Sequence, residues 1–332
     1  MVDESNAWAV ILAAGEGSRL RALTTLPSGI AVPKQFCSLY EGPSLLEEAL
    51  RRGESVADRS RICAVVAAQH RRWWQDALGS LPERNVIVQP QNRGTANGIL
   101  LPLMHILRRD PSARIVLLPS DHHVLQEAVL TASLKDALEQ LDWRSEETLL
   151  LGIQPGELDP DLGYILPGGT DGRGALTVAR FVEKPPQPVA GELIRAGGLW
   201  NAFIVVTTAG ALCDLFRERI PEVVEAMCAA VQRDAQGFGI AAVTELYPRL
   251  PTIDFSRDIV AGQESKLRVL PVRPCGWSDL GTPMRVAEVL DRARRAKAAL
   301  PGRSAARAHV SLAAQHERMQ VRGHGNRAAA AQ

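Results

Sequence analysis

A glycine-rich turn follows the first apolar segment of the chain, in AVILAAGEGSRL. Gly15 and Gly17 stand after a strand-like run and before a helical pattern. Glycine lets the backbone approach a phosphate closely, and the free amides and dipole at a helix N-terminus attract that anion. Two residues on, the guanidinium of Arg19 could grip a polyphosphate with paired hydrogen bonds. A phosphate-binding turn and a purely structural turn are both open at this point.

Two other phosphate-binding patterns do not fit this turn. The dinucleotide fingerprint needs a third glycine where this chain has Leu20, and an acidic residue after the second strand, where it has Gln69 and His70. The chain contains no GKS or GKT, which a Walker P-loop requires. The sequence therefore disfavours a Rossmann dehydrogenase and a P-loop enzyme.

A few charged residues elsewhere stand at positions suited to chemistry. Lysine is scarce, with five against 33 arginines, and both Lys34 and Lys184 adjoin a proline. Each lysine could equally be a solvated loop charge. Asp121 follows an apolar run and Asp279 precedes a helical pattern, so either could cap a helix. His122 and His123 lack metal-ligand spacing and receive no role, and Trp200 and Trp277 are expected in the core.

The surrounding elements alternate between buried strands and helices. Apolar runs such as RICAVVAA, ARIVLLPS and TLLLGI are separated by helical patterns through residue 155. Strands without polar alternation are buried on both faces, which indicates βαβ units and a parallel sheet. From residue 156 to 300, GYILPG, LTVARFVEKP and LWNAFIVV predict a mixed sheet that extends the first. We expect one α/β domain over residues 1–300 with a doubly wound, mostly parallel Rossmann-like sheet, then a disordered Ala/Arg-rich tail over 301–332.

Composition narrows the class of protein. With 332 residues and 46% hydrophobic content, the chain can bury a large core. A formal net charge of +1 does not suggest a nucleic-acid partner. Five scattered cysteines without a CxxC pair argue against a disulfide framework or a zinc knuckle. The acidic start MVDESNAW and the lack of an apolar run of about 18 residues predict a cytoplasmic protein with no membrane partner.

Taken together, AAGEGSRL and PKQF, with Lys34 fifteen positions after Arg19, resemble the GxGxRL…PK signature of sugar-1-phosphate nucleotidyltransferases. PKQF is most similar to the mannose-1-phosphate guanylyltransferase branch. Further blocks follow in the order of that family: RGTA, LLPSDH, GYI, FVEKP, LWNAFIV, TIDF and WSDLG. The resemblance covers roughly residues 8–290, and the joint match is too specific to arise by chance.

The resemblance implies a nucleotide-diphospho-sugar transferase fold, with a nucleotide-binding half over 1–155 and a sugar-phosphate-binding half over 156–300. It implies catalytic roles for Arg19, Lys34, Asp121 and Asp279, of which the two aspartates would also hold Mg²⁺. The implied nucleotide contacts are Leu12, Ala13, Ala14, Gly15, Gly17, Ser18, Arg19, Lys34, Gly94 and Thr95. The implied sugar-phosphate contacts are Gly163, Glu183, Lys184 and Asn201.

The implied reaction is direct in-line transfer of GMP from GTP to mannose 1-phosphate, with release of pyrophosphate. The chain departs from the family pattern in three blocks. RGTANGI stands for RNTAPAI, GIAVPKQF lacks the usual basic residue before PKQF, and LWNAFIV lacks the small Ser-Gly pair of WNSGMF. The base and the sugar are therefore less narrowly indicated than the reaction. A thymidylyl- or uridylyltransferase acting on glucose 1-phosphate or another sugar 1-phosphate is one alternative, and an inactive sugar-nucleotide-binding regulator is another. A homodimer is compatible with the resemblance.

Overall fold

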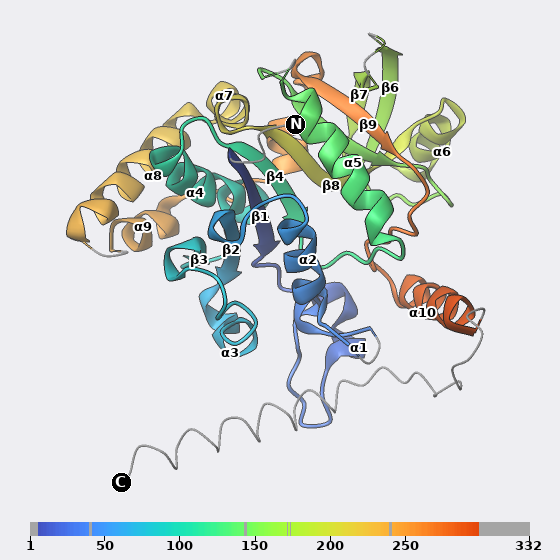
Figure 1. Ribbon diagram of the computed structural model, residues 1–332, viewed down its shortest axis with the longest axis horizontal. Helices are drawn as coiled ribbons and strands as arrows, with labels where there is room; N and C mark the ends of the chain where they lie inside the picture. Colours follow the sequence, from blue (N-terminus) through green and yellow to red (C-terminus); the bar gives the residue numbers. More distant parts are fainter. Residues whose placement is uncertain are drawn as a thin grey trace.

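A computed structural model describes residues 6–39, 42–142, 145–170, 172, 174–238 and 241–298, and the tail predicted over 301–332 lies outside them. Within these residues one nine-stranded sheet is covered by helices (Figure 1). The strands are β1 (Ala7–Ala13), β2 (Ile62–Ala67), β3 (Val86–Gln89), β4 (Arg114–Pro119), β5 (Thr148–Ile153), β6 (Tyr164–Thr170), β7 (Leu176–Val182), β8 (Leu199–Thr208) and β9 (Leu267–Val272). The helices are α1 (Arg21–Thr24), α2 (Leu45–Glu54), α3 (Arg71–Trp74), α4 (Gly94–Arg109), α5 (Glu127–Gln140), α6 (Gln187–Arg195), α7 (Ala209–Arg219), α8 (Pro221–Arg233), α9 (Ala241–Leu246) and α10 (Pro283–Ala298).

The sheet combines a parallel part with a mixed part, in the order β3-β2-β1-β4-β8-β5-β9-β7-β6. Strands β1 to β4 pair in parallel, and β9 pairs in parallel with β5. Strand β8 runs antiparallel between β4 and β5. The predicted α/β class, with a parallel part and a mixed extension, is confirmed, although the antiparallel pairings of β8 separate β5 from the other strands of the first half.

Helices cover both faces of the sheet because its central strands are apolar on both sides. Ala9 and Ile11 of β1 belong to the hydrophobic layer of α2 and α5, whereas Trp8 and Val10 belong to the layer of α4, α7 and α8. Successive side chains of a strand point to opposite faces, so an uninterrupted apolar run needs a cover on each. Figure 1 shows α4, α7 and α8 gathered on one side of the sheet.

Local hydrogen bonds accompany the start of α2 and the end of α3. Ser44 accepts a hydrogen bond from the Glu47 amide and Glu47 bonds back to Ser44, which forms a capping box at the start of α2. The helix expected over HRRWWQDAL is shorter than the pattern suggests, since α3 ends at Trp74, whose indole donates to the Ala67 carbonyl at 2.9 Å. None of the helices in the described part of the chain is both long and apolar enough to cross a lipid bilayer.

Strand pairing brings the motif-bearing segments to one end of the sheet. Strands β1 and β4 are parallel with Leu12 opposite Pro119, so the glycine-rich turn and the segment holding Asp121 leave the sheet at the same edge. Loops at the carboxyl ends of parallel strands are where α/β proteins bind ligands.

The mixed part of the sheet reaches the same end. Tyr164 pairs with Trp200 of β8 and with Val182 of β7. The start of β6, the end of β7 and the start of β8 therefore adjoin. GYI, FVEKP and LWNAFIV thus contribute to one region next to the parallel part.

Candidate functional site

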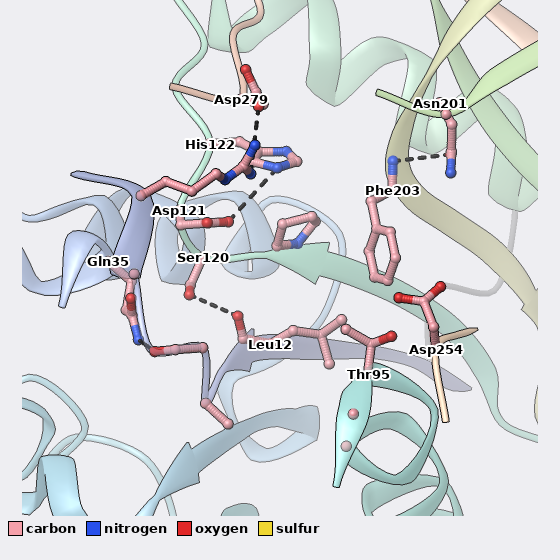
Figure 2. A pocket seen from close by; sticks show the side chains of 18 of the residues that line it. Leu12, Gln35, Thr95, Ser120, Asp121, His122, Asn201, Phe203, Asp254 and Asp279 are labelled. Atoms are coloured by element: carbon pink, nitrogen blue, oxygen red, sulfur yellow. Dashed lines mark hydrogen bonds and ion pairs between the residues drawn. The ribbon is translucent and has the colours of Figure 1, made fainter. Parts of the chain in front are cut away.

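A cavity of about 520 Å³ lies at this end of the sheet, beside a smaller one of about 150 Å³ (Figure 2). Most residues implied by the resemblance line the larger cavity: Leu12, Ala14, Gly15, Gly17, Arg19, Gly94, Thr95, Asp121, Gly163, Glu183, Lys184, Asn201 and Asp279. Lys34 lines the smaller cavity together with Gly17, Arg19 and Asp121. Ala13 lines neither of the two, because its side chain is buried in the core. Ser18 begins a short 3-10 helix after the turn.

Hydrogen bonds from the PKQF segment fix the conformation of the glycine-rich turn. Gln35 Nε2 donates to the carbonyls of Ala13 and Gly15, at 3.1 and 2.7 Å. Gly17 has a φ of 63°, and a Cβ there would lie 2.7 Å from the Lys34 amide nitrogen. A glycine is therefore required at position 17, both for the left-handed backbone and for the close approach of the two segments.

The RGTA segment begins α4 and is bonded to TIDF. Gly94 has a φ of 82°, and a Cβ there would collide with the carbonyl of Ile253. The Phe255 amide donates to Thr95 Oγ1 at 2.8 Å. The departure Gly94 from the family's asparagine thus has a physical reason, because only glycine fits against the Ile253 backbone.

Asp121 and Asp279 are held near each other by backbone pairing between their loops. His123 and Ser278 form an antiparallel bridge with two 2.9 Å hydrogen bonds. Neither aspartate caps a helix: α5 starts after Gln126 without a side-chain cap, and the hydroxyl of Thr282 accepts from the first turn of α10. The capping alternative fails for both residues, and both carboxylates line the cavity.

Lys34 connects these two loops. Its ammonium donates to the Asp279 carbonyl at 2.6 Å and lies 3.0 Å from Asp121 Oδ2, with only 6% of the residue exposed. Burial raises the pKa of the Asp121 carboxyl, but the charges of Lys34 and His122 outweigh burial and leave that pKa below its usual value. Asp121 is therefore a carboxylate at neutral pH.

Arg285 on α10 is a residue that the motif comparison missed. Its Nη1 donates to Asp279 Oδ1 at 2.5 Å, it pairs with Glu157 and Asp159, and its guanidinium lies over the Trp200 ring. Burial raises the pKa of Asp279, but His122 and Arg285 outweigh that effect and the pKa is lowered. The segment MRVAEVL shows only a helical period, so nothing local distinguishes this arginine from a surface charge.

The two carboxylates fit magnesium as a donor set. In the part of the chain described above, no cluster of three or more His, Cys, Asp or Glu could hold a metal alone. Magnesium is usually bound by one or two carboxylates together with substrate phosphates and water. Gly281 and Arg285 bond Asp279 Oδ1, and Oδ2 lies 3.9 Å from Arg19 Nη2. One carboxylate oxygen thus lies on the side of the glycine-rich turn.

Glu183, Asn201 and Gly163 form the other end of the cavity. The backbone amide of Asn201 donates to the Gly163 carbonyl at 2.8 Å. A Cβ on Gly163 would lie 2.5 Å from Glu183 Oε2. Lys184, with a φ of 48°, has an exposed side chain whose ammonium lies 3.9 Å from Glu183 Oε1. Burial, and then the nearby Asp254 charge, raise the pKa of Glu183 to about 7. This end combines a carboxyl group and a side-chain amide, both able to bond hydroxyls, with a cation.

The raised pKa of Glu183 predicts a pH-dependent stability. The folded protein keeps the proton up to about pH 7, whereas the unfolded chain loses it near the ordinary value of 4.5, so this residue lowers the free energy of unfolding as the pH rises between these values. We expect Glu183→Gln to be more stable relative to wild type at pH 8 than at pH 5, by about 1 to 3 kcal/mol. Denaturant unfolding at both pH values measures this. The raised pKa of Glu183 would be contradicted if the stability difference between Glu183→Gln and wild type were the same at pH 5 and pH 8. It would also be contradicted if the exposed Glu222→Gln showed the same change with pH.

Trp277 and His122 line the cavity together with the two carboxylates, and Trp200 packs against Trp277. Trp200 and Trp277 are buried in the core as predicted, and Trp277 also lines the cavity. The ring of His122, which received no role from the sequence, meets Trp277 edge-on at 5.2 Å. In the sequence, His122 has no metal-ligand spacing that would mark it as a site residue. Only the folded chain brings its ring to the wall of the cavity.

Comparison with known proteins agrees with this arrangement. Residues 8–295 match the family model described as nucleotidyl transferase. The putative mannose-1-phosphate guanylyltransferase of Vibrio cholerae is 27% identical over 294 residues, which cover 85% of this chain and 60% of that protein. Mannose-1-phosphate guanylyltransferase of Escherichia coli is 28% identical over 84% of this chain and 59% of the relative. This chain thus spans about 60% of the length of these curated relatives.

A solved structure has the same fold. The crystal structure named as mannose-1-phosphate geranyltransferase from Thermus thermophilus superposes with a TM-score of 0.73 at 26% identity, covering 86% of this chain and 79% of the other. The likeness confirms the nucleotide-sugar transferase type of sheet. With a family match over most of its length, the chain belongs to the nucleotidyl transferase family.

Proposed function

We propose that this chain transfers a nucleotidyl group, GMP from GTP, to mannose 1-phosphate and releases pyrophosphate. One observation carries the proposal: a single cavity has the phosphate-binding turn and two aspartates at one end, and Glu183, Lys184 and Asn201 at the other. Such a cavity suits a triphosphate and a sugar phosphate bound together. Relatives named as mannose-1-phosphate guanylyltransferases favour this pair of substrates.

In the proposed mechanism the chain positions the substrates and stabilises charge. The sugar phosphate oxygen is already anionic, so it needs no general base. That oxygen bonds to the α-phosphorus while the bond to the β-phosphate oxygen breaks, and pyrophosphate leaves with the electron pair. Arg19 and Lys34 neutralise the departing pyrophosphate, and Lys184 holds the sugar phosphate. Magnesium, held by Asp121 and Asp279, would add positive charge at the phosphate oxygens.

We assign residues 1–155 to the nucleotide and residues 156–300 to the sugar phosphate. The cysteines of this chain are all free, which suits a reducing compartment, and we propose a cytoplasmic location. Thymidylyl or uridylyl transfer to glucose 1-phosphate is the second candidate, favoured by Gly94 in place of the family's asparagine. An inactive regulator is disfavoured because Arg19, Lys34 and both aspartates are kept and assembled at one place.

A substrate matrix tests the proposal. Pyrophosphate release is measured for GTP, dTTP, UTP, ATP and CTP, each with mannose, glucose and galactose 1-phosphates. We expect GTP with mannose 1-phosphate to give the highest kcat/KM. A preference of about tenfold or more for dTTP or UTP would replace the guanylyl assignment and keep the reaction class. No release from any pair would reject the transferase itself.

A further inference from the structure

Phe203 is, with Lys184, one of two non-glycine residues with a left-handed backbone among the described residues that line the larger cavity. Its φ is 54°, in the left-handed region that a side chain with a Cβ adopts at an energetic cost. Such outliers persist where the surrounding structure over-determines them, and they concentrate at functional sites. The usual family pattern WNSGMF has a glycine at this position, which could adopt the same φ without strain. The chain keeps the conformation and carries a large aromatic ring on it.

A β-bulge in strand β8 directs this ring. Val205 pairs with Leu150, whereas Asn201 pairs with Gly152, so three residues of β8 stand opposite one residue of β5. Phe203 is the middle residue of the three. Bulges re-aim a side chain next to active sites. Figure 2 shows the ring extending from β8 into the cavity, toward Thr95 and Asp254.

Contacts on each side hold the ring in place. The Phe203 amide donates to Asn201 Oδ1 at 3.0 Å, and the ring packs edge-on against Phe255 with centroids 5.9 Å apart. Phe203 is only half-buried, so much of the ring remains open to the cavity. The bond to Asn201 Oδ1 also occupies the acceptor of that amide and directs its Nδ2 to act as the donor toward a ligand.

We propose that Phe203 determines sugar specificity by filling space that a glycine would leave open between Asn201 and Asp254. The inference rests on the proposed function for its substrates. The ring offers an apolar surface to the C–H face of a pyranose, while Glu183 and Asn201 bind its hydroxyls. It also blocks bulky ring substituents. The cavity therefore accepts hexose 1-phosphates that carry only hydroxyls and excludes 2-acetamido sugars.

Two substitutions remove the ring without opposing the backbone. Phe203→Gly suits a φ of 54°, and Phe203→Asn tolerates it and serves if the glycine variant folds poorly. Phe216→Leu is the matched control, because Phe216 also packs against Phe255, is fully buried and does not line the cavity. It should lose stability and keep selectivity.

Calorimetry of the full chain measures the affinities for mannose 1-phosphate, N-acetylglucosamine 1-phosphate and GTP, and hence the ratio of acetamido-sugar to hexose affinity. Pyrophosphate release gives kcat/KM. We expect Phe203→Gly or Phe203→Asn to raise the acetamido-to-hexose affinity ratio at least about tenfold, while GTP affinity changes less than about twofold. An unchanged ratio, or an equal loss for GTP, overturns the inference.

The same measurements separate the inference from the proposed function. If wild type releases no pyrophosphate from any substrate pair, the transferase proposal fails, and the calorimetric ratio still decides the role of Phe203. If neither sugar phosphate binds wild type or the variants, the inference is overturned as well.

Discussion

Asp279→Asn is expected to lower turnover by roughly 100-fold or more, the scale seen when one preorganised electrostatic contact is lost. Asparagine keeps the shape of the side chain and removes its charge. Asp279 is only 4% exposed and lines the cavity with Asp121. The pKa of its carboxyl is lowered, so the negative charge is present throughout the neutral range. The magnesium concentration for half-maximal rate should rise in parallel, which a titration of initial rates measures.

A structural explanation must be separated from this one, because Asp279 also pairs with the buried Arg285. Glu157→Gln is the matched control: Glu157 pairs with the same guanidinium, yet its side chain is 45% exposed and does not line the cavity. We expect this control to keep turnover within about threefold of wild type, as surface substitutions usually do little. An equal loss in both variants would assign the effect to Arg285 and its ion pairs rather than to the metal.

Lys34→Met should also reduce turnover by about 100-fold, and it should weaken triphosphate binding more than sugar phosphate binding. The ammonium is buried between the Asp279 carbonyl and Asp121, and it lines the small cavity beside Arg19. Removing it deletes positive charge where pyrophosphate would leave and frees Asp121 from its ion pair. Binding of GTP and of mannose 1-phosphate is measured separately by calorimetry, with turnover measured on the same preparations.

Lys184→Met supplies the reciprocal control for that experiment. Its ammonium lies at the other end of the cavity, beside Glu183, and is more than half exposed. We expect it to weaken mannose 1-phosphate binding and to leave GTP binding within about twofold of wild type. If both lysine variants lose both substrates equally, the division of the cavity into a nucleotide end and a sugar-phosphate end is wrong.

The order and type of many elements follow from the sequence, because their signals are local. Apolar runs without polar alternation predicted β2, β4 and β5 as strands buried on both faces, and each is buried along its whole length. The glycine-rich turn was predicted from residue types and spacing. Gly17 has the left-handed backbone that favours glycine, and its contact with the Lys34 amide leaves no room for a Cβ. These features depend on dihedral preferences and side-chain period, which a short segment carries with it.

Several contacts between distant segments were decided by the tertiary structure alone. A buried apolar strand has the same sequence pattern whichever strands flank it. The local pattern of β8 therefore did not indicate that this strand lies between β4 and β5. The same holds for Arg285, whose partners lie 6 to 128 positions away, and for the bridge between His123 and Ser278. Even the left-handed φ of Phe203 depends on a bulge against β5. Contacts of this kind form through backbone hydrogen bonds and charge pairing across the folded sheet, and these energies exist only once the chain has closed its long loops.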